Sequence, residues 1–147
     1  MLKSAFTLFP HCIATYVCII GAVCLLAFGW QPKKIDPPVY IVSNPEMVAR
    51  EAAQKANGNV WHVGYTGSMK PLLQGGEYAV TAKDFSNIKE GQILVYHATY
   101  NKNPIIHRAV QHDSYGWLMS GDSAKISESW SRVTEQNYIG TVIAIYK

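Results

Sequence analysis

Cysteine is scarce in this chain of 147 residues, and its placement is uneven. Only three cysteines occur, and all of them lie between residues 12 and 24. The rest of the chain therefore has neither a disulfide framework nor a cysteine-based zinc site. The three are spaced six residues apart, which would put successive side chains on different faces of a helix. We interpret them as small apolar side chains.

Clusters of basic residues and of metal ligands are also missing. The formal net charge is only +3, and the 13 lysines and arginines are scattered along the chain. Proteins that bind nucleic acid usually concentrate such residues in a run or on one face, so we expect no nucleic-acid partner. The five histidines form no helical i, i+4 pair and have no accompanying carboxylate cluster. We expect no metal and no other cofactor.

Charge is absent from residues 12–30 (CIATYVCIIGAVCLLAFGW). This length is close to the roughly 20 residues that cross a bilayer core. A cleaved signal peptide is the alternative, but its apolar region usually spans only about 7–15 residues and ends near a small-x-small cleavage site, which is missing before Gln31. We therefore interpret residues 1–30 as an N-terminal tail and a retained, single transmembrane helix in contact with lipid.

The character of the chain changes twice after this segment. Residues 31–59 are typical of a linker and one short helix, because prolines crowd the linker, Asn44 and Pro45 suit a helix start, and an Asn-Gly pair at 57–58 ends it. From residue 60 the apolar residues recur with a period of two, as in strands. We expect strands at residues 60–65, 77–81, 93–96, 105–110, 116–119 and 140–146. The pattern predicts a mainly β domain over residues 60–147.

Three short motifs follow one another within this β region. They are TGSMKP at residues 66–71, PIIHR at residues 104–108 and MSGD at residues 119–122. In this order they resemble the type I signal peptidases and the related LexA-like serine peptidases, and most closely the Ser-His branch of the endoplasmic reticulum and archaea. The resemblance covers roughly residues 60–145. It implies a signal-peptidase-like β fold and a serine endopeptidase activity.

A serine hydroxyl needs a neighbouring base before it becomes a good nucleophile. Ser68 is the candidate nucleophile, and His107 is the candidate general base, since an imidazole changes its charge near neutral pH. The two lie 39 residues apart, so only the fold can bring them together. The resemblance further implies that the backbone N–H of Ser68 and the hydroxyl of Thr66 bind the oxyanion of the intermediate.

The acid that orients His107 is left open by the sequence. In the Ser-His branch, carboxylates at the Gly-Asp turn and about six residues beyond it are both implicated, which points to Asp122 and Glu128 as catalytic candidates. Glu128 stands where the family usually has aspartate. Asp122 has a second interpretation, in which it forms a structural ion pair with Arg108.

These observations predict a membrane-anchored serine endopeptidase that cleaves signal peptides or similar exported precursors. A specialised processing or self-cleaving peptidase of a mobile element is one alternative. A membrane-anchored interaction protein whose peptidase site has decayed is another. The natural substrate and the oligomeric state do not follow from the sequence.

Two arguments about the side of the membrane on which the domain lies give opposite answers. Lys33 and Lys34 follow the apolar segment, and the positive-inside rule would keep them in the cytoplasm. The resemblance implies the opposite, because a signal sequence presents its cleavage site on the far side of the membrane. The charge imbalance across the segment is only about one or two residues, so we expect an extracytoplasmic catalytic domain.

Overall fold

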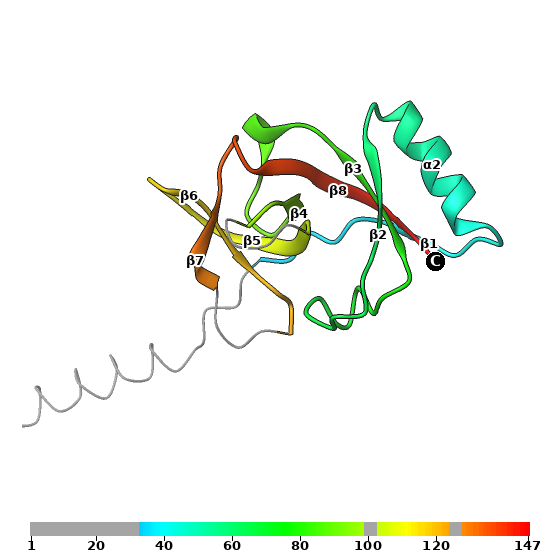
Figure 1. Ribbon diagram of the computed structural model, residues 1–147, viewed down its shortest axis with the longest axis horizontal. Helices are drawn as coiled ribbons and strands as arrows, with labels where there is room; N and C mark the ends of the chain where they lie inside the picture. Colours follow the sequence, from blue (N-terminus) through cyan, green and yellow to red (C-terminus); the bar gives the residue numbers. More distant parts are fainter. Residues whose placement is uncertain (1–32, 99–102, 124–127) are drawn as a thin grey trace, which may run out of the picture. The chain divides into compact units, whose positions relative to one another are not determined.

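A curled β-sheet with one helix on it forms the part of the chain that the structure describes (Figure 1). The structure is a computed structural model, and it describes residues 33–98, 103–123 and 128–147. No helix within these ranges is long and apolar enough to span a bilayer. The segment expected to do so, residues 12–30, lies outside the described residues.

The sheet has eight strands in the order β2-β3-β8-β4-β5-β6-β7, with β1 pairing in parallel with β8. All other neighbouring pairs are antiparallel. The strands are β1 (Val39–Tyr40), β2 (Asn59–His62), β3 (Tyr78–Ala82), β4 (Ile93–Tyr96), β5 (Ile105–Asp113), β6 (Gly116–Ser120), β7 (Glu128–Val133) and β8 (Tyr138–Tyr146). The helices are α2 (Pro45–Lys55) and the short 3-10 turn η1 (Phe85–Asn87).

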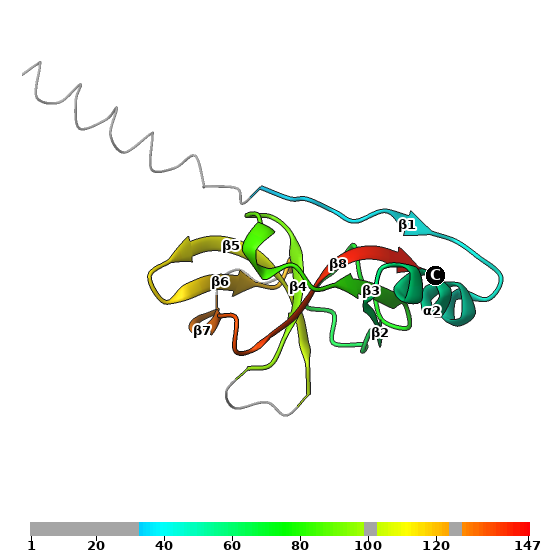
Figure 2. The ribbon, with the colours of Figure 1, turned by 90° about the horizontal axis from the view of Figure 1, so that it is seen from above.

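The long strand β8 joins the two halves of the sheet (Figure 2). Its first residues pair with β4 and its later residues pair with β3. The register shifts at residues 80–81 of β3 and at residues 95–96 of β4. Such irregularities bend a strand and increase its twist, so they account for the curling. The expectation of a mainly β domain is confirmed, although β7 was not among the predicted strands.

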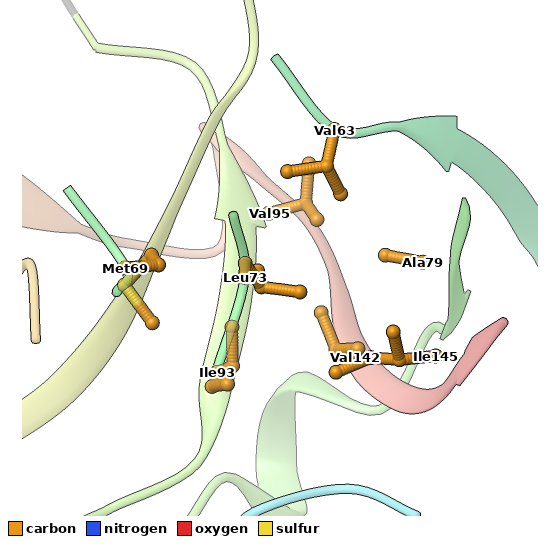
Figure 3. Close-up of a cluster of buried hydrophobic side chains, with 8 residues drawn as sticks. All are labelled: Val63, Met69, Leu73, Ala79, Ile93, Val95, Val142 and Ile145. Atoms are coloured by element: carbon orange, nitrogen blue, oxygen red, sulfur yellow. The ribbon is translucent and has the colours of Figure 1, made fainter. Parts of the chain in front are cut away.

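Three apolar clusters fill the inside of the curled sheet and the space under the helix. The central cluster combines side chains of β3, β4 and β8 with side chains from the segment between β2 and β3 (Figure 3). Its members are Val63, Met69, Leu73, Ala79, Ile93, Val95, Val142 and Ile145. Because Val63 before the motif and Leu73 after it are both buried, the segment that carries Ser68 is attached to the core on both sides of the motif.

The helix α2 begins where the sequence predicts. The side chain of Asn44 accepts a hydrogen bond from the backbone N–H of Met47 at 3.2 Å, which satisfies one of the unpaired donors of the first turn. Ala49 and Ala53 are buried against Val80 and its neighbours on the sheet. The helix and β1 belong to the same compact unit as the sheet.

The end of α2 approaches the sheet too closely for a side chain. Asn57 has a positive φ of 49°, and the backbone N–H of Gly58 donates to the carbonyl of Ala53 at 2.8 Å. A Cβ on Gly58 would overlap the carbonyl oxygen of Thr81 in β3. The glycine is therefore required by the contact between the helix end and the sheet edge.

We expect Gly58→Ala to destabilise the domain by about 1–3 kcal/mol, the usual range for an overpacked site. Gly64→Ala is the control, because a Cβ there meets nothing closer than a methyl carbon at 4.0 Å. Urea unfolding of both variants measures the difference. Equal stability of the two variants would contradict the close approach at Gly58.

Candidate active site

The segment between β2 and β3 holds Ser68 in a closed loop. The backbone N–H of Val63 donates to the carbonyl of Glu77, and the N–H of Gly76 donates to the carbonyl of Val63, both at 2.8 Å. Inside the loop, the N–H of Lys70 donates to the carbonyl of Gly67 at 3.2 Å. These bonds fix both the entrance of the loop and the turn around Ser68.

The carboxylate of Glu77 stabilises the same loop from within. It accepts hydrogen bonds from the backbone N–H groups of Gln74, at 2.9 Å, and Gly75, at 2.8 Å. Lys147 lies 3.5 Å from it. Burial acts to raise the pKa of the Glu77 carboxyl, but these hydrogen bonds and the charge of Lys147 outweigh burial, so the pKa lies below its ordinary value.

Ser68, Thr66 and His107 line one cavity of about 560 Å³. The Oγ atoms of Thr66 and Ser68 lie 3.2 Å apart. His107 enters the cavity from the beginning of β5, where it pairs with Leu94 of β4. The structure therefore brings to one cavity the three side chains that the sequence separates by up to 41 positions.

The remaining walls of this cavity are largely apolar. They include Leu73, Val95 and Ile106, and no carboxylate is found among the described residues that line it. An apolar wall lowers the local dielectric and strengthens hydrogen bonds made to a developing charge. The arrangement suits a site in which a hydroxyl and an imidazole act on a bound group.

His107 is buried, with 6% of its surface exposed. Its Nδ1 lies 3.5 Å from the hydroxyl of Tyr96, a fully buried residue of β4. This distance is at the outer limit for a hydrogen bond, and catalytic hydrogen bonds often shorten only when substrate is bound. Tyr96 was not among the predicted site residues, because it ends an apolar strand and nothing in its sequence neighbours indicates the contact.

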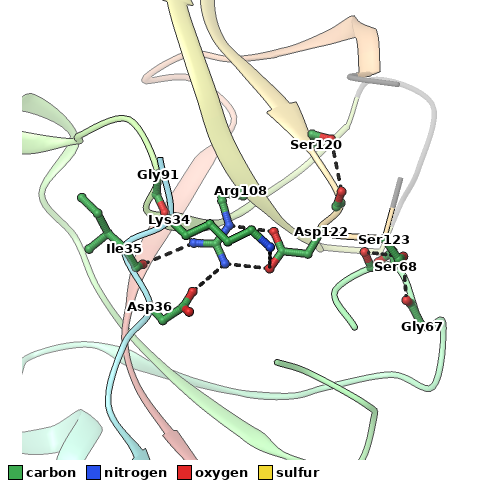
Figure 4. A network of polar contacts seen from close by, with 11 residues as sticks. Lys34, Ile35, Asp36, Gly67, Ser68, Gly91, Arg108, Ser120, Asp122 and Ser123 are labelled. Atoms are coloured by element: carbon green, nitrogen blue, oxygen red, sulfur yellow. Dashed lines mark hydrogen bonds and ion pairs between the residues drawn. The ribbon is translucent and has the colours of Figure 1, made fainter. Parts of the chain in front are cut away.

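Arg108, next to His107 in β5, forms a network on its own side of the strand (Figure 4). Its Nε and Nη2 donate to the two carboxylate oxygens of Asp122, each at 2.7 Å. Nη2 also donates to Asp36 at 2.7 Å, and Nη1 donates to the carbonyls of Gly91, at 2.6 Å, and Ile35, at 3.4 Å. Burial acts to lower the pKa of Arg108, but the hydrogen bonds and charges of the two aspartates outweigh it and raise the pKa.

The two candidate acids have different places. Both oxygens of Asp122 are bonded to Arg108, and Asp122 is not among the residues that line the cavity. Glu128 begins β7, and its backbone pairs with Met119 of β6, while its side chain lies outside the described residues. The acid that orients His107 therefore stays a prediction.

The Gly-Asp turn contacts the Ser68 loop directly. The N–H of Ser123 donates to the carbonyl of Ser68 at 3.0 Å, and its hydroxyl lies 2.9 Å from the carbonyl of Gly67. A Cβ on Gly121 would lie 2.7 Å from the carbonyl oxygen of Ser68, so only glycine allows this approach. The third sequence motif thus packs against the first.

No protein-family model matches the chain, and no curated protein matches it.

The contacts of Glu77 predict that the loop that carries Ser68 loses stability at acidic pH. A carboxyl whose pKa is lowered by folding contributes stability above its unfolded pKa, here about 4.5, and the contribution is lost as the pH falls through the lower, folded pKa. We expect Glu77→Gln to lower the free energy of unfolding by about 1–3 kcal/mol at pH 7. The difference from the wild type should shrink below pH 4.

Thermal or urea unfolding at pH 7 and at pH 3 measures this difference. Glu90→Gln is a matched control, because Glu90 is exposed. If Glu77→Gln lowers the free energy of unfolding by the same amount at both pH values, the charge of Glu77 does not contribute to stability.

Proposed function

We propose that this protein is a membrane-anchored serine endopeptidase with a signal-peptidase-like fold, and that it cleaves signal peptides or similar exported precursors. The observation that carries the proposal is the cavity shared by Ser68, Thr66 and His107. The curled β-sheet and the order of the three motifs support it.

In the proposed mechanism, His107 takes the proton from the Ser68 hydroxyl as that oxygen attacks the scissile carbonyl. The N–H of Ser68 and the hydroxyl of Thr66 stabilise the oxyanion. His107 then returns the proton to the leaving amine, and water hydrolyses the acyl-enzyme. The hydroxyl of Thr66, 3.2 Å from that of Ser68, is close enough to serve an oxyanion formed at Ser68.

The substrate is proposed to lie as an extended strand across the cavity. Residues 105–107 pair with β4, and the pairing with β6 starts only at Arg108. No described strand extends the β6 side of β5 to residues 105 and 106, so this edge suits a peptide that adds as a strand. The apolar walls formed by Leu73, Val95 and Ile106 favour small apolar side chains beside the cleaved bond.

Removal of either catalytic group tests the proposal. Ser68→Ala and His107→Ala should each lower the cleavage of a peptide with a small-x-small motif by about a thousandfold or more. His97→Ala and His112→Ala are matched controls that should stay active, because both residues are exposed and neither lines the cavity. Activity of the wild type should rise with pH as the imidazole of His107 loses its proton.

The measurement is the turnover of that peptide by full-length protein in detergent, with product masses read by mass spectrometry. A wild-type turnover in Ser68→Ala would remove Ser68 from the mechanism. A wild type without peptidase activity would favour a decayed interaction protein. Cleavage confined to the chain's own sequence would favour a specialised, self-cleaving peptidase.

The proposal places the catalytic domain outside the cytoplasm, attached to the membrane by residues 12–30. Tyr65 would then help to seat the site at the membrane surface, because this residue is 80% exposed near Ser68 and aromatic rings favour the membrane–water interface on either side. The bias from Lys33 and Lys34 is small and opposes this placement.

Fusion of alkaline phosphatase after Lys147 should give an active reporter in bacterial cells, because the enzyme folds only outside the cytoplasm. The control is the same fusion to a chain that lacks residues 1–30, which should be inactive. An inactive phosphatase together with a fluorescent protein that glows at the same position would place the domain inside. That result would leave the specialised processing peptidase as the better proposal.

A further inference from the structure

We propose that Ser123 and Asp36 are positioning residues for the Ser68 N–H that binds the oxyanion. The proposal rests on the proposed function. Neither residue lines the cavity, so both act through the backbone of the Ser68 loop. Asp36 belongs to the segment before the motifs, where the sequence alone indicates only a linker.

The first step is the attachment of Ser123 to the Ser68 turn. Its N–H donates to the carbonyl of Ser68 at 3.0 Å. Its hydroxyl proton is shared between the carbonyls of Gly67, at 2.9 Å, and Ser68, at 2.8 Å. Two consecutive carbonyls of the loop are therefore held by one residue (Figure 4).

The second step follows from the planarity of the peptide bond. The carbonyl of Gly67 and the N–H of Ser68 belong to the same peptide unit, and in a trans unit they point in opposite directions. A hydrogen bond that fixes the Gly67 carbonyl therefore also fixes the direction of the Ser68 N–H. Within the turn, only the N–H of Lys70, at 3.2 Å, also donates to the Gly67 carbonyl. Gly67 has a positive φ of 75° and no side chain that could restrain the peptide further, so Ser123 adds a second, shorter bond to this carbonyl.

The third step is the support of Ser123 by its neighbour Asp122. The side chain of Asp122 is 3% exposed, and both of its oxygens are bonded to Arg108. All five N–H donors of the guanidinium have acceptors, which are Asp122, Asp36 and the carbonyls of Gly91 and Ile35. Arg108 is only 1% exposed, so replacing a charged acceptor by a neutral, weaker one leaves a buried charged donor poorly satisfied.

The fourth step is the role of Asp36 in this network. The Nη2 of Arg108 donates to Asp36 and to Asp122, each at 2.7 Å. Lys34 lies 3.7 Å from Asp122, so two cations and two carboxylates balance one another. Asp36 therefore helps to hold the guanidinium of Arg108 in the orientation in which it binds Asp122. A change at Asp36 should reach the Ser68 turn through Arg108, Asp122 and Ser123.

The test uses full-length protein in detergent and two readouts. The first is kcat and KM for a small-x-small peptide. The second is hydrogen–deuterium exchange of residues 64–73, which needs no catalysis. Ser123→Ala should lower kcat by about tenfold to a hundredfold, as a displaced catalytic group does, with KM little changed. Asp36→Asn should lower kcat severalfold, and both variants should exchange faster over residues 64–73.

Matched variants separate positioning from general loss of structure. Asp113→Asn removes a carboxylate from another arginine pair, with Arg132 at 2.8 Å, and Ser86→Ala removes an exposed hydroxyl bonded to Asp84. Both should keep wild-type kcat and wild-type exchange over residues 64–73. Ser123→Thr keeps the hydroxyl and should recover part of the activity that Ser123→Ala loses, which also covers the case in which the alanine variant folds poorly.

Unchanged exchange in both Ser123→Ala and Asp36→Asn would overturn the inference, whatever the activity. Faster exchange with an unchanged kcat in an active enzyme would overturn it as well. A wild type without peptidase activity would defeat the proposed function instead, and the exchange measurement would still decide whether Asp36 and Ser123 hold the turn.

Discussion

The bond between Arg108 and Asp122 is the interaction on which the arrangement of the site depends. It joins β5, which carries His107, to the turn that contacts Ser68, and it also draws in the segment that contains Asp36. Breaking a buried ion pair by removing one partner typically costs about 3–5 kcal/mol, because the other charge stays buried. The network thus stabilises the fold, and it also helps to set how far His107 on β5 lies from the Ser68 loop.

Much of the fold follows from local sequence. The helix start at Asn44 and the strand at residues 93–96 lie where capping and apolar periodicity predict them. The strand β7 was missed, because residues 128–133 (ESWSRV) are mostly polar and carry only a weak pattern. The pairing of β1 with the end of β8 was also missed, since a two-residue strand after a proline-rich segment has no periodicity.

The site could be predicted only in part, for a physical reason. Ser68 and His107 lie in short motifs that the sequence alone singles out. The fold then places both residues in the wall of one cavity. The contacts of Asp36 and Ser123 depend on packing between segments far apart in the chain. The contact of Tyr96 with His107 depends on the register between β4 and β5. Such contacts leave no pattern in the neighbouring sequence. The same holds for the close approach of Gly121 to the Ser68 carbonyl, which leaves no room for a Cβ at residue 121.

The central claim is that Ser68 and His107 act as a pair, and thiol reactivity tests it without any substrate. The chain has no cysteine outside residues 12–24, so Ser68→Cys in a background with those three replaced by alanine gives one reactive thiol. A neighbouring imidazole stabilises the thiolate. The account predicts that iodoacetamide alkylates this variant near pH 6 much faster than the same variant carrying His107→Ala. Equal alkylation rates at every pH would contradict the pairing.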